Sequence, residues 1–267
     1  MQVAFTTYST PDWTPEVIAE QAAALGFDAV ELRTYEGHHV PSEPGPEELR
    51  RLRTAFASRG VPLCALGTSC QLAADGERRV HELEEARRYL RLAGELGAPI
   101  LRVFGGPHGE GGQVAAVRRV AEALGELAEP ARAAGVRLAL ETHDAFSAGA
   151  LVGEVLRQVD HPYVGACWDW LHPFRAGETL AETYGHLRGR VVHTHTKDAA
   201  QVDGRWEARY FGEGQLPLAE ILGLLVADGY DGPLSLEWEP RGKDPHPERA
   251  LAQYVPAIRR LLAAHRP

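Results

Sequence analysis

Short β-type apolar runs alternate with amphipathic helical segments along the whole sequence, and this alternation limits the fold more than any other feature. Expected strands cover residues 3–7, 28–33, 61–66, 100–104, 137–141, 163–168, 190–195 and 233–238. Expected helices cover residues 15–25, 46–58, 77–96, 113–134, 148–159, 180–187, 218–227 and 247–264. Glycine follows several of these helices, as at Gly26 and Gly97, which is a common helix stop. Strict alternation predicts parallel strands joined by crossover helices.

The number of repeats and the chain length together favour a closed barrel. Eight strand and helix pairs in 267 residues fit a (β/α)8 barrel, which typically needs about 250 residues. We therefore predict an α/β fold with residues 1–267 forming one barrel domain. Two small domains are an alternative on length alone. An open doubly wound sheet would normally bind a nucleotide through a glycine-rich first turn, and here that turn is Thr6-Thr7-Tyr8-Ser9.

Four chemically reactive side chains stand at the ends of the last four expected strands. They are Glu141, Asp169, His195 and Glu237. In such a barrel the carboxyl ends of the strands carry the active site, so we expect these side chains to converge there. A buried carboxylate is costly unless it is paired or metal-bound, and three carboxylates with one imidazole are an O/N ligand set for a divalent cation. Taken alone, each residue would more often cap a helix or pair with an arginine, and only the four together favour a metal site.

The layer below these residues is expected to be small. Inward-facing positions there are Ala139, Cys167, His193 and Ser235, which leaves room for a ligand above the packed core. His193 and His195 point to the same face because strand side chains alternate with period two. We expect His193 to be a hydrogen-bonded core histidine rather than a ligand.

Further polar residues follow the same strands and form a second group of candidates. His172 lies three residues after Asp169 and is expected to contact substrate. His143 lies two residues after Glu141, so it is expected either to contact substrate or to orient Glu141. Arg102 and Lys197 could bind an anionic or hydroxylated substrate, although either could merely neutralise the acids. Glu31 and Glu239 are also site-facing acids on this pattern, and salt bridges would explain them equally well.

The long segment 196–215 is expected to be a loop at the mouth of the barrel. It contains Phe211-Gly212-Glu213-Gly214 and is flanked by Lys197 and Arg209. Loops after the seventh and eighth strands of such barrels often form anion sites, and glycines permit close backbone approach. We therefore predict that Arg209 and this loop border the substrate.

Composition excludes some classes of partner. A formal net charge of −9 argues against a large nonspecific polyanion surface, so we expect no nucleic-acid partner. No apolar run approaches 18 residues and the N-terminus lacks a signal-like pattern, which predicts no membrane span or export. Cys64, Cys70 and Cys167 lack CxxC spacing, so we expect reduced thiols in a cytoplasmic protein. A homo-oligomer is left open.

The motifs at the strand ends resemble a known superfamily. Leu-Glu-Thr-His-Asp, Cys-Trp-Asp-Trp-Leu-His, Val-His-Thr-His-Thr-Lys-Asp, Phe-Gly-Glu-Gly and Ser-Leu-Glu-Trp-Glu are similar to the xylose isomerase-like TIM-barrel superfamily, in particular its sugar phosphate isomerase/epimerase group. The resemblance implies one divalent metal ion, commonly manganese, magnesium or cobalt and less often zinc, on Glu141, Asp169, His195 and Glu237. It also implies a small carbohydrate substrate whose proton is exchanged by Glu141 and Glu237 through an enediolate.

Other members of that superfamily define the alternatives. They include inosose and dehydroshikimate dehydratases, hydroxypyruvate isomerase and the endonuclease IV enzymes. The trinuclear zinc site of the endonucleases is not supported, because strands three and four end in Gly67-Thr68-Ser69 and Arg102-Val103-Phe104. Ketose 3-epimerases usually carry Gly-Glu and a nearby Arg after the strand-seven histidine, where this chain has Thr196-Lys197-Asp198. A dehydratase on the same metal site is the main alternative, and a non-catalytic sugar-binding barrel is the rival from another class.

Overall fold

The structure is a closed barrel of eight parallel strands, as the alternation predicts. It is a computed structural model that describes residues 1–239 and 247–265. Around the barrel the strands run in the order β1-β12-β9-β8-β7-β6-β5-β2. Their bounds are β1 Gln2–Thr6, β2 Ala29–Leu32, β5 Leu63–Gln71, β6 Ile100–Phe104, β7 Arg137–Glu141, β8 Val164–Asp169, β9 Val191–Thr196 and β12 Pro233–Leu236. β1 pairs in parallel with both β2 and β12, which closes the sheet.

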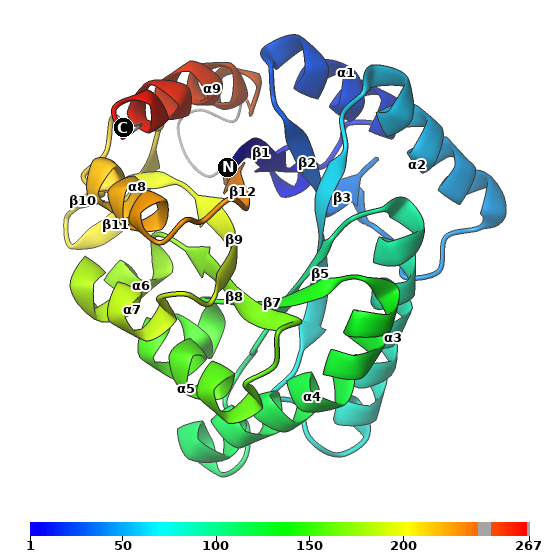
Figure 1. Cartoon of the computed structure of the whole chain (residues 1–267), viewed down its shortest axis with the longest axis vertical. Helices are drawn as coiled ribbons and strands as arrows, with labels where there is room; N and C mark the ends of the chain where they lie inside the picture. Colours follow the sequence, from blue (N-terminus) through cyan, green and yellow to red (C-terminus); the bar gives the residue numbers. More distant parts are fainter. Residues whose placement is uncertain (240–246, 266–267) are drawn as a thin grey trace.

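Helices surround the barrel as a ring, which Figure 1 shows. Their bounds are α1 Pro15–Leu25, α2 Pro46–Arg59, α3 Gly76–Leu96, α4 Gly112–Ala134, α5 Gly149–Val159, α6 His172–Arg175, α7 Leu180–Leu187, α8 Leu218–Ala227 and α9 Pro247–Ala263, with 3-10 turns η1 Thr7–Ser9 and η2 Asp144–Phe146. α1 illustrates the local signals: the Thr14 side chain accepts from the Val17 N–H, and Gly26 ends the helix at φ 80°. In the described part of the chain, no helix is long and apolar enough to cross a membrane.

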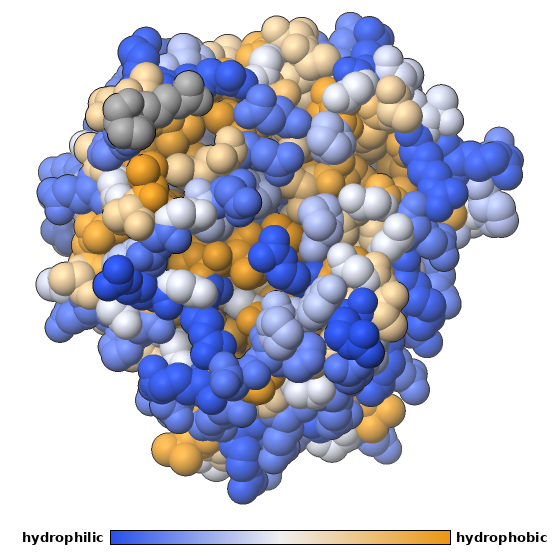
Figure 2. Space-filling model, viewed as in Figure 1, coloured by the Kyte–Doolittle hydropathy of each residue, from blue (hydrophilic) through white to orange (hydrophobic). Residues whose placement is uncertain are grey.

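Small side chains fill the inside of the barrel. A compact cluster there contains Ala4, Ala29, Cys64, Ala65, Ile100, Ala139 and Cys167. The larger apolar side chains pack between the strands and the helices, for example Phe5, Ile18 and Leu124. All three cysteines are buried and free. Hydrophilic side chains cover most of the rim of the face in Figure 2, and apolar ones are visible toward its centre.

Three segments differ most from the sequence-based expectation. β5 extends to Gln71, and its pairing with β6 is irregular between Gly67 and Gln71, so the strand does not end at residue 66. The segment 34–39 forms the two-stranded sheet β3 Thr34–Tyr35 and β4 His38–His39. Most of the expected loop 196–215 is likewise a hairpin, β10 Asp198–Val202 with β11 Arg205–Arg209.

The second hairpin has a clear local cause. Its turn is Asp203-Gly204, and both residues have positive φ, 48° and 76°. Asp-Gly between two strands favours a tight turn whose twist matches the strands. The loop interpretation of this segment was therefore wrong because it overlooked that dipeptide.

Candidate active site

The four predicted ligands come together at the carboxyl ends of the strands. Glu141 ends β7, Asp169 ends β8, His195 lies near the end of β9, and Glu237 follows β12. One ligand atom from each lies within 4.8 Å of the others. Register explains part of this convergence, since His195 pairs with Asp169 on one side and with Ser235 on the other. Glu141, Asp169 and His195 are at most 1% exposed.

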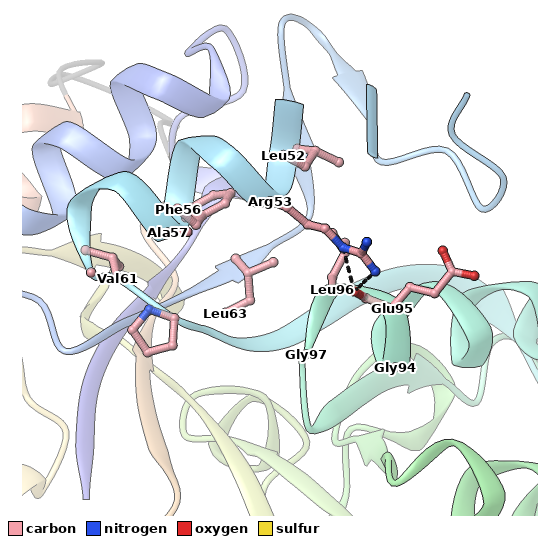
Figure 3. A pocket seen from close by; sticks show the side chains of 12 residues that line it. Leu52, Arg53, Phe56, Ala57, Val61, Leu63, Gly94, Glu95, Leu96 and Gly97 are labelled. Atoms are coloured by element: carbon pink, nitrogen blue, oxygen red, sulfur yellow. Dashed lines mark hydrogen bonds between the residues drawn. The ribbon is translucent and has the colours of Figure 1, made fainter. Parts of the chain in front are cut away.

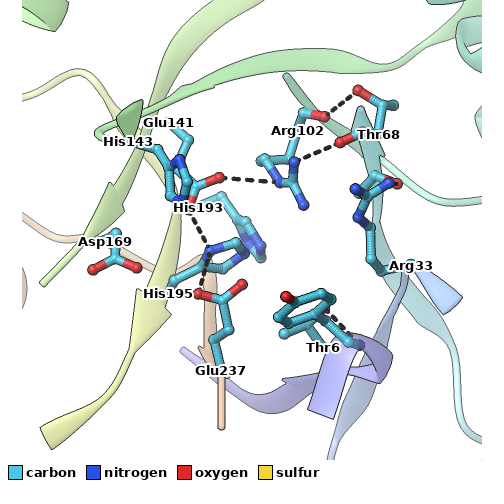
Figure 4. Close-up of polar contacts among 12 residues, drawn as sticks. Thr6, Arg33, Thr68, Arg102, Glu141, His143, Asp169, His193, His195 and Glu237 are labelled. Atoms are coloured by element: carbon cyan, nitrogen blue, oxygen red, sulfur yellow. Dashed lines mark hydrogen bonds and ion pairs between the residues drawn. The ribbon is translucent and has the colours of Figure 1, made fainter. Parts of the chain in front are cut away.

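His195 presents one ring nitrogen to this cluster. Nδ1 lies 2.9 Å from Glu141 Oε1 and 3.6 Å from Glu237 Oε2, as Figure 4 shows. Nε2 points the other way, 3.0 Å from Glu31 Oε2. Burial opposes a charge on the ring, but the carboxylates of Glu31, Glu141 and Glu237 raise the pKa of His195 well above its ordinary value. Nδ1 is therefore the atom that faces the other candidate ligands.

Glu31 fixes the histidines from beneath the cluster. This carboxylate is fully buried on β2, and its Oε2 accepts from Ser235 Oγ at 2.9 Å. It also lies 2.9 Å from His193 Nε2, so His193 is a hydrogen-bonded core histidine, as expected. A carboxylate that holds the far nitrogen of a ligating histidine orients the ring and raises its basicity. Glu31 thus supports His195 rather than joining the four ligands.

Lys197 bridges two of the acids. Its Nζ lies 2.7 Å from Asp169 Oδ2, 2.5 Å from Glu237 Oε2 and 3.6 Å from Glu239 Oε1. Burial disfavours the ammonium charge, but the neighbouring carboxylates raise the pKa of Lys197 well above its ordinary value. The backbone N–H groups of Leu171 and His172 donate to Asp169 Oδ1, which fixes that carboxylate.

The two other predicted histidines, His143 and His172, pack edge to face, and His172 lies beside Asp169. His172 is 9% exposed, and its Nε2 lies 3.8 Å from Asp169 Oδ2, too far for a hydrogen bond. Burial lowers the pKa of His172. The His143 ring centroid is 4.4 Å from that of His172, and His143 Nδ1 lies 2.8 Å from Asp144 Oδ1. Both histidines therefore border the cluster without contacting Glu141 directly.

Arginine side chains close the opposite side of the cluster. Arg102 Nε lies 3.2 Å from Glu141 Oε2, and its Nη1 donates to the Thr68 carbonyl at 2.6 Å. Sequence reasoning placed Arg102 here but did not single out Arg33, which is 7% exposed. Period two along β2 puts Arg33 on the same face as Glu31, and that signal could have found it.

A cavity of about 730 Å³ adjoins the cluster. Its lining includes Lys197, Arg209, Glu213, Glu237 and Glu239, with the aromatic rings of Trp206, Tyr210 and Trp238. The predicted 211–214 segment reaches this cavity through Glu213, whereas Phe211 is buried. The N–H groups of Gly212 and Gly214 both donate to Asp198 Oδ2. An added Cβ at Gly214 would overlap the Asp198 carboxylate.

A second cavity, of about 530 Å³, lies away from these residues. Figure 3 shows it between α2 and the end of α3, with Leu52, Phe56 and Leu63 in its wall. The guanidinium of Arg53 is held there by the Glu95 carbonyl. This cavity lacks the converging acids and imidazole, so we assign the chemistry to the cluster at the strand ends.

The donor set suits a divalent cation. Three carboxylates and one imidazole offer oxygen-rich coordination of the kind that Mg²⁺ and Mn²⁺ accept. In the described part of the chain, Glu141 Oε2 and Asp169 Oδ2 are buried and make no hydrogen bond, although each has a cation nearby, Arg102 Nε at 3.2 Å and Lys197 Nζ at 2.7 Å. Buried oxygens are normally hydrogen-bonded, so two that are not fit a site for an ion.

Comparison with known proteins gives relatives of several reaction classes. The chain is 29% identical to 3-dehydroshikimate dehydratase from Pseudomonas aeruginosa over 98% of this chain and 41% of that protein, so it spans about two fifths of that relative's length. It is 29% identical to fructoselysine 3-epimerase from Escherichia coli O157:H7, over 45% of this chain and 44% of the relative. Among solved structures, 3-keto-D-glucoside 4-epimerase from E. coli matches with a TM-score of 0.78, 18% identity and coverage of 98% and 99%, which speaks for the fold alone.

The sequence profile that matches is described as xylose isomerase-like TIM barrel, and it covers residues 19–261. That range includes all four candidate ligands and seven of the eight barrel strands. The closed barrel and the resemblance of the strand-end motifs agree with it. The chain belongs to the xylose isomerase-like TIM barrel family.

Proposed function

We propose that Glu141, Asp169, His195 and Glu237 hold one divalent metal ion, and that the site removes a proton next to a carbonyl of a small carbohydrate. The observation that carries this proposal is the convergence of three carboxylates and one imidazole within 4.8 Å, beside a cavity of about 730 Å³. The outcome would be isomerisation or epimerisation. The fructoselysine 3-epimerase among the relatives supports this reaction class.

The chain's own residues divide the work. A bound Mn²⁺, Mg²⁺ or Co²⁺ ion would polarise the substrate carbonyl and so favour the enediolate. Glu141 and Glu237 come from strands on either side of β8 and β9, and they would take and return the proton on opposite faces of the substrate. Glu31 keeps His195 Nδ1 directed at the cluster through its contact with Nε2. His143, His172, Arg102, Lys197 and Arg209 would bind the substrate's oxygens.

A dehydratase is the second candidate. The position of the Lys197 ammonium next to Glu237 favours it. The same proton removal becomes elimination when a hydroxyl leaves from the next carbon, and that hydroxyl must receive a proton. The Lys197 ammonium lies 2.5 Å from Glu237 Oε2, so an acid stands directly beside the proposed base. The dehydratase relative aligns over 98% of this chain.

Solvent exchange tests both candidates. Purified protein is treated with EDTA, reloaded with Mn²⁺, and incubated in D₂O with ketoses, keto-inositols, their phosphates and 3-dehydroshikimate. We expect deuterium incorporation by NMR only in the metal-loaded sample. A new epimer or isomer identifies the first function, whereas loss of water with a new double bond identifies the second. Stoichiometric metal without exchange in any substrate would contradict the proposal and favour a binding barrel.

Variants separate proton transfer from metal retention. Glu141→Gln and Glu237→Gln keep a ligating oxygen but lose the titratable group, so exchange should fall by about 10² or more while some metal stays bound. Asp169→Ala and His195→Ala should mainly weaken metal binding, and added Mn²⁺ should partly restore their activity. Near-normal exchange in both glutamine variants at saturating metal would rule out the two-glutamate mechanism.

A further inference from the structure

Arg33 is a buried cation that has no carboxylate partner among residues 1–239 and 247–265. It is 7% exposed and follows β2 at the mouth of the barrel. Its guanidinium donates to Ser69 Oγ at 2.9 Å and to the Gly67 carbonyl at 3.5 Å. In the described part of the chain, no carboxylate oxygen lies within 4.0 Å of it. The neighbouring Arg102, by contrast, is paired with Glu141.

Arg33 and Arg102 are held close together. Both side chains pass over Gly67, where an added Cβ would lie 2.9 Å from Arg102 Nη2 and 2.9 Å from Arg33 Cδ. Only a residue without a side chain leaves room there for both stems. Burial, and next the charge of Arg102, lower the pKa of Arg33 to about 10. Burial and then these two arginines also lower the pKa of His39, on the nearby β4.

The acids nearest to this pair are already engaged. Glu31 contacts His193, His195 and Ser235, and Glu141 contacts both His195 and Arg102. An ion taken out of water costs several kcal/mol unless a counter-charge repays it, so a second buried guanidinium is unfavourable for the free protein. Such a group is retained at little net cost where a ligand brings the missing negative charge.

We propose that Arg33 and Arg102 form a subsite for an oxyanion of the substrate, a carboxylate or a phosphate. Figure 4 shows both arginines across the barrel mouth from Asp169, so one end of a substrate would meet the guanidinium pair while its carbonyl faced the acid cluster. Guanidinium groups match oxyanions with paired N–H donors. The proposal rests on the proposed function of the cluster and narrows its substrate to an anionic hydroxycarbonyl compound rather than a neutral sugar.

Binding to EDTA-treated protein tests the subsite without turnover. Isothermal titration compares two matched pairs, D-gluconate with D-glucitol and D-fructose 6-phosphate with D-fructose, at fixed ionic strength. We expect the anion of at least one pair to bind about 10-fold or more tightly than its neutral partner, because charge-assisted hydrogen bonds are stronger than neutral ones. A preference in the first pair identifies a carboxylate, and one in the second identifies a phosphate. Equal binding within both pairs overturns the proposal.

Variants then assign the preference to Arg33. Arg33→Gln should abolish the preference for the anion and leave the affinity for the neutral ligand unchanged. The melting temperature should stay the same or rise, because an unpaired buried charge has been removed. Arg33→Lys should keep part of it, since the charge remains without the paired donors. The control is Arg50→Gln, which removes one charge from the exposed face of α2. An undiminished preference in Arg33→Gln, or in Arg33→Lys if the first variant does not fold, overturns the assignment.

This test fails separately from the proposed function. Anion preference without solvent exchange in metal-loaded protein would keep the subsite and reject the proton-transfer function. Solvent exchange on neutral ketoses without any preference for anions would support the proton-transfer function and reject the subsite.

Discussion

Replacing Glu31 with glutamine isolates the contribution of the residue beneath the metal cluster. The Glu31 carboxylate holds His193 Nε2 at 2.9 Å, His195 Nε2 at 3.0 Å and Ser235 Oγ at 2.9 Å. Glutamine has nearly the same volume but offers one acceptor oxygen in place of two. Its NH₂ group would face an imidazole N–H or a hydroxyl. Both carboxylate oxygens of Glu31 lie close to His195 Nε2, at 3.0 and 3.1 Å, so in either orientation the NH₂ group faces that nitrogen and weakens the contact, without creating a cavity.

The expected magnitude follows from what these contacts do. Loss of a carboxylate that orients a metal-ligating histidine typically costs 10- to 100-fold in metal affinity, about 1.4–2.7 kcal/mol. In metal-free protein, where Glu31 helps to raise the pKa of His195, the change also breaks a buried charged pair. That costs about 3–5 kcal/mol in unfolding free energy. The metal-free variant should therefore melt at a markedly lower temperature than the wild-type protein.

The assay is a titration of EDTA-treated protein with Mn²⁺. Binding is monitored by calorimetry or by the electron paramagnetic resonance signal of free Mn²⁺. Glu178→Gln is the matched control, because Glu178 also accepts three hydrogen bonds, from Gly149 N–H, Ala150 N–H and Thr183 Oγ1, away from the cluster. Folded Glu31→Gln with wild-type affinity for Mn²⁺ would refute the reasoning that Glu31 orients His195. A loss of the same size in Glu178→Gln would show a general effect on stability instead.

Two further predictions concern pH and the 211–214 segment. The pKa of His195 is raised above that of the unfolded chain, so its protonated form stabilises metal-free protein fully below about pH 6.5 and the effect is lost as pH rises through the folded pKa. Because a metal replaces that proton, the rise in melting temperature on adding Mn²⁺ should grow from pH 6 to pH 8, and a flat profile would contradict this. Gly214→Ala should lower the free energy of unfolding by about 1–3 kcal/mol through the clash with Asp198, as measured by denaturant unfolding, whereas Gly125→Ala on α4, where an added Cβ meets no atom within 4 Å, should not.

Much of the fold and of the cluster could be predicted because both depend on local periodicity. A period-two run that ends on Glu141 or Asp169 predicts toward which face of the sheet that side chain points and at which end of the strand it lies. The parallel topology then brings such ends together, whatever the details of the loops. The structure confirms the barrel, and it places the four predicted side chains within 4.8 Å of one another.

Contacts across the barrel could not be predicted in the same way. Glu31 and His195 are 164 residues apart, and their contact depends on the barrel's tilt and stagger rather than on any pattern within β2 or β9. The bridge from Lys197 to Asp169 and Glu237 depends on a side-chain path that no spacing specifies. The β10-β11 hairpin is a different case, since Asp203-Gly204 signals it locally.

Glu31 and Arg33 show why the partners of a charged group matter more than its position. Both lie on one face of the same segment, but only Glu31 was predicted from the sequence to be a site-facing charge. The structure gives Glu31 three partners and leaves Arg33, in the described part of the chain, without an acid. A fully partnered buried carboxylate serves the protein's own architecture, whereas a buried cation that lacks its counter-charge favours a ligand that supplies one. The selectivity of this barrel for substrate charge should therefore depend on Arg33. Its affinity for the metal ion should depend on Glu31.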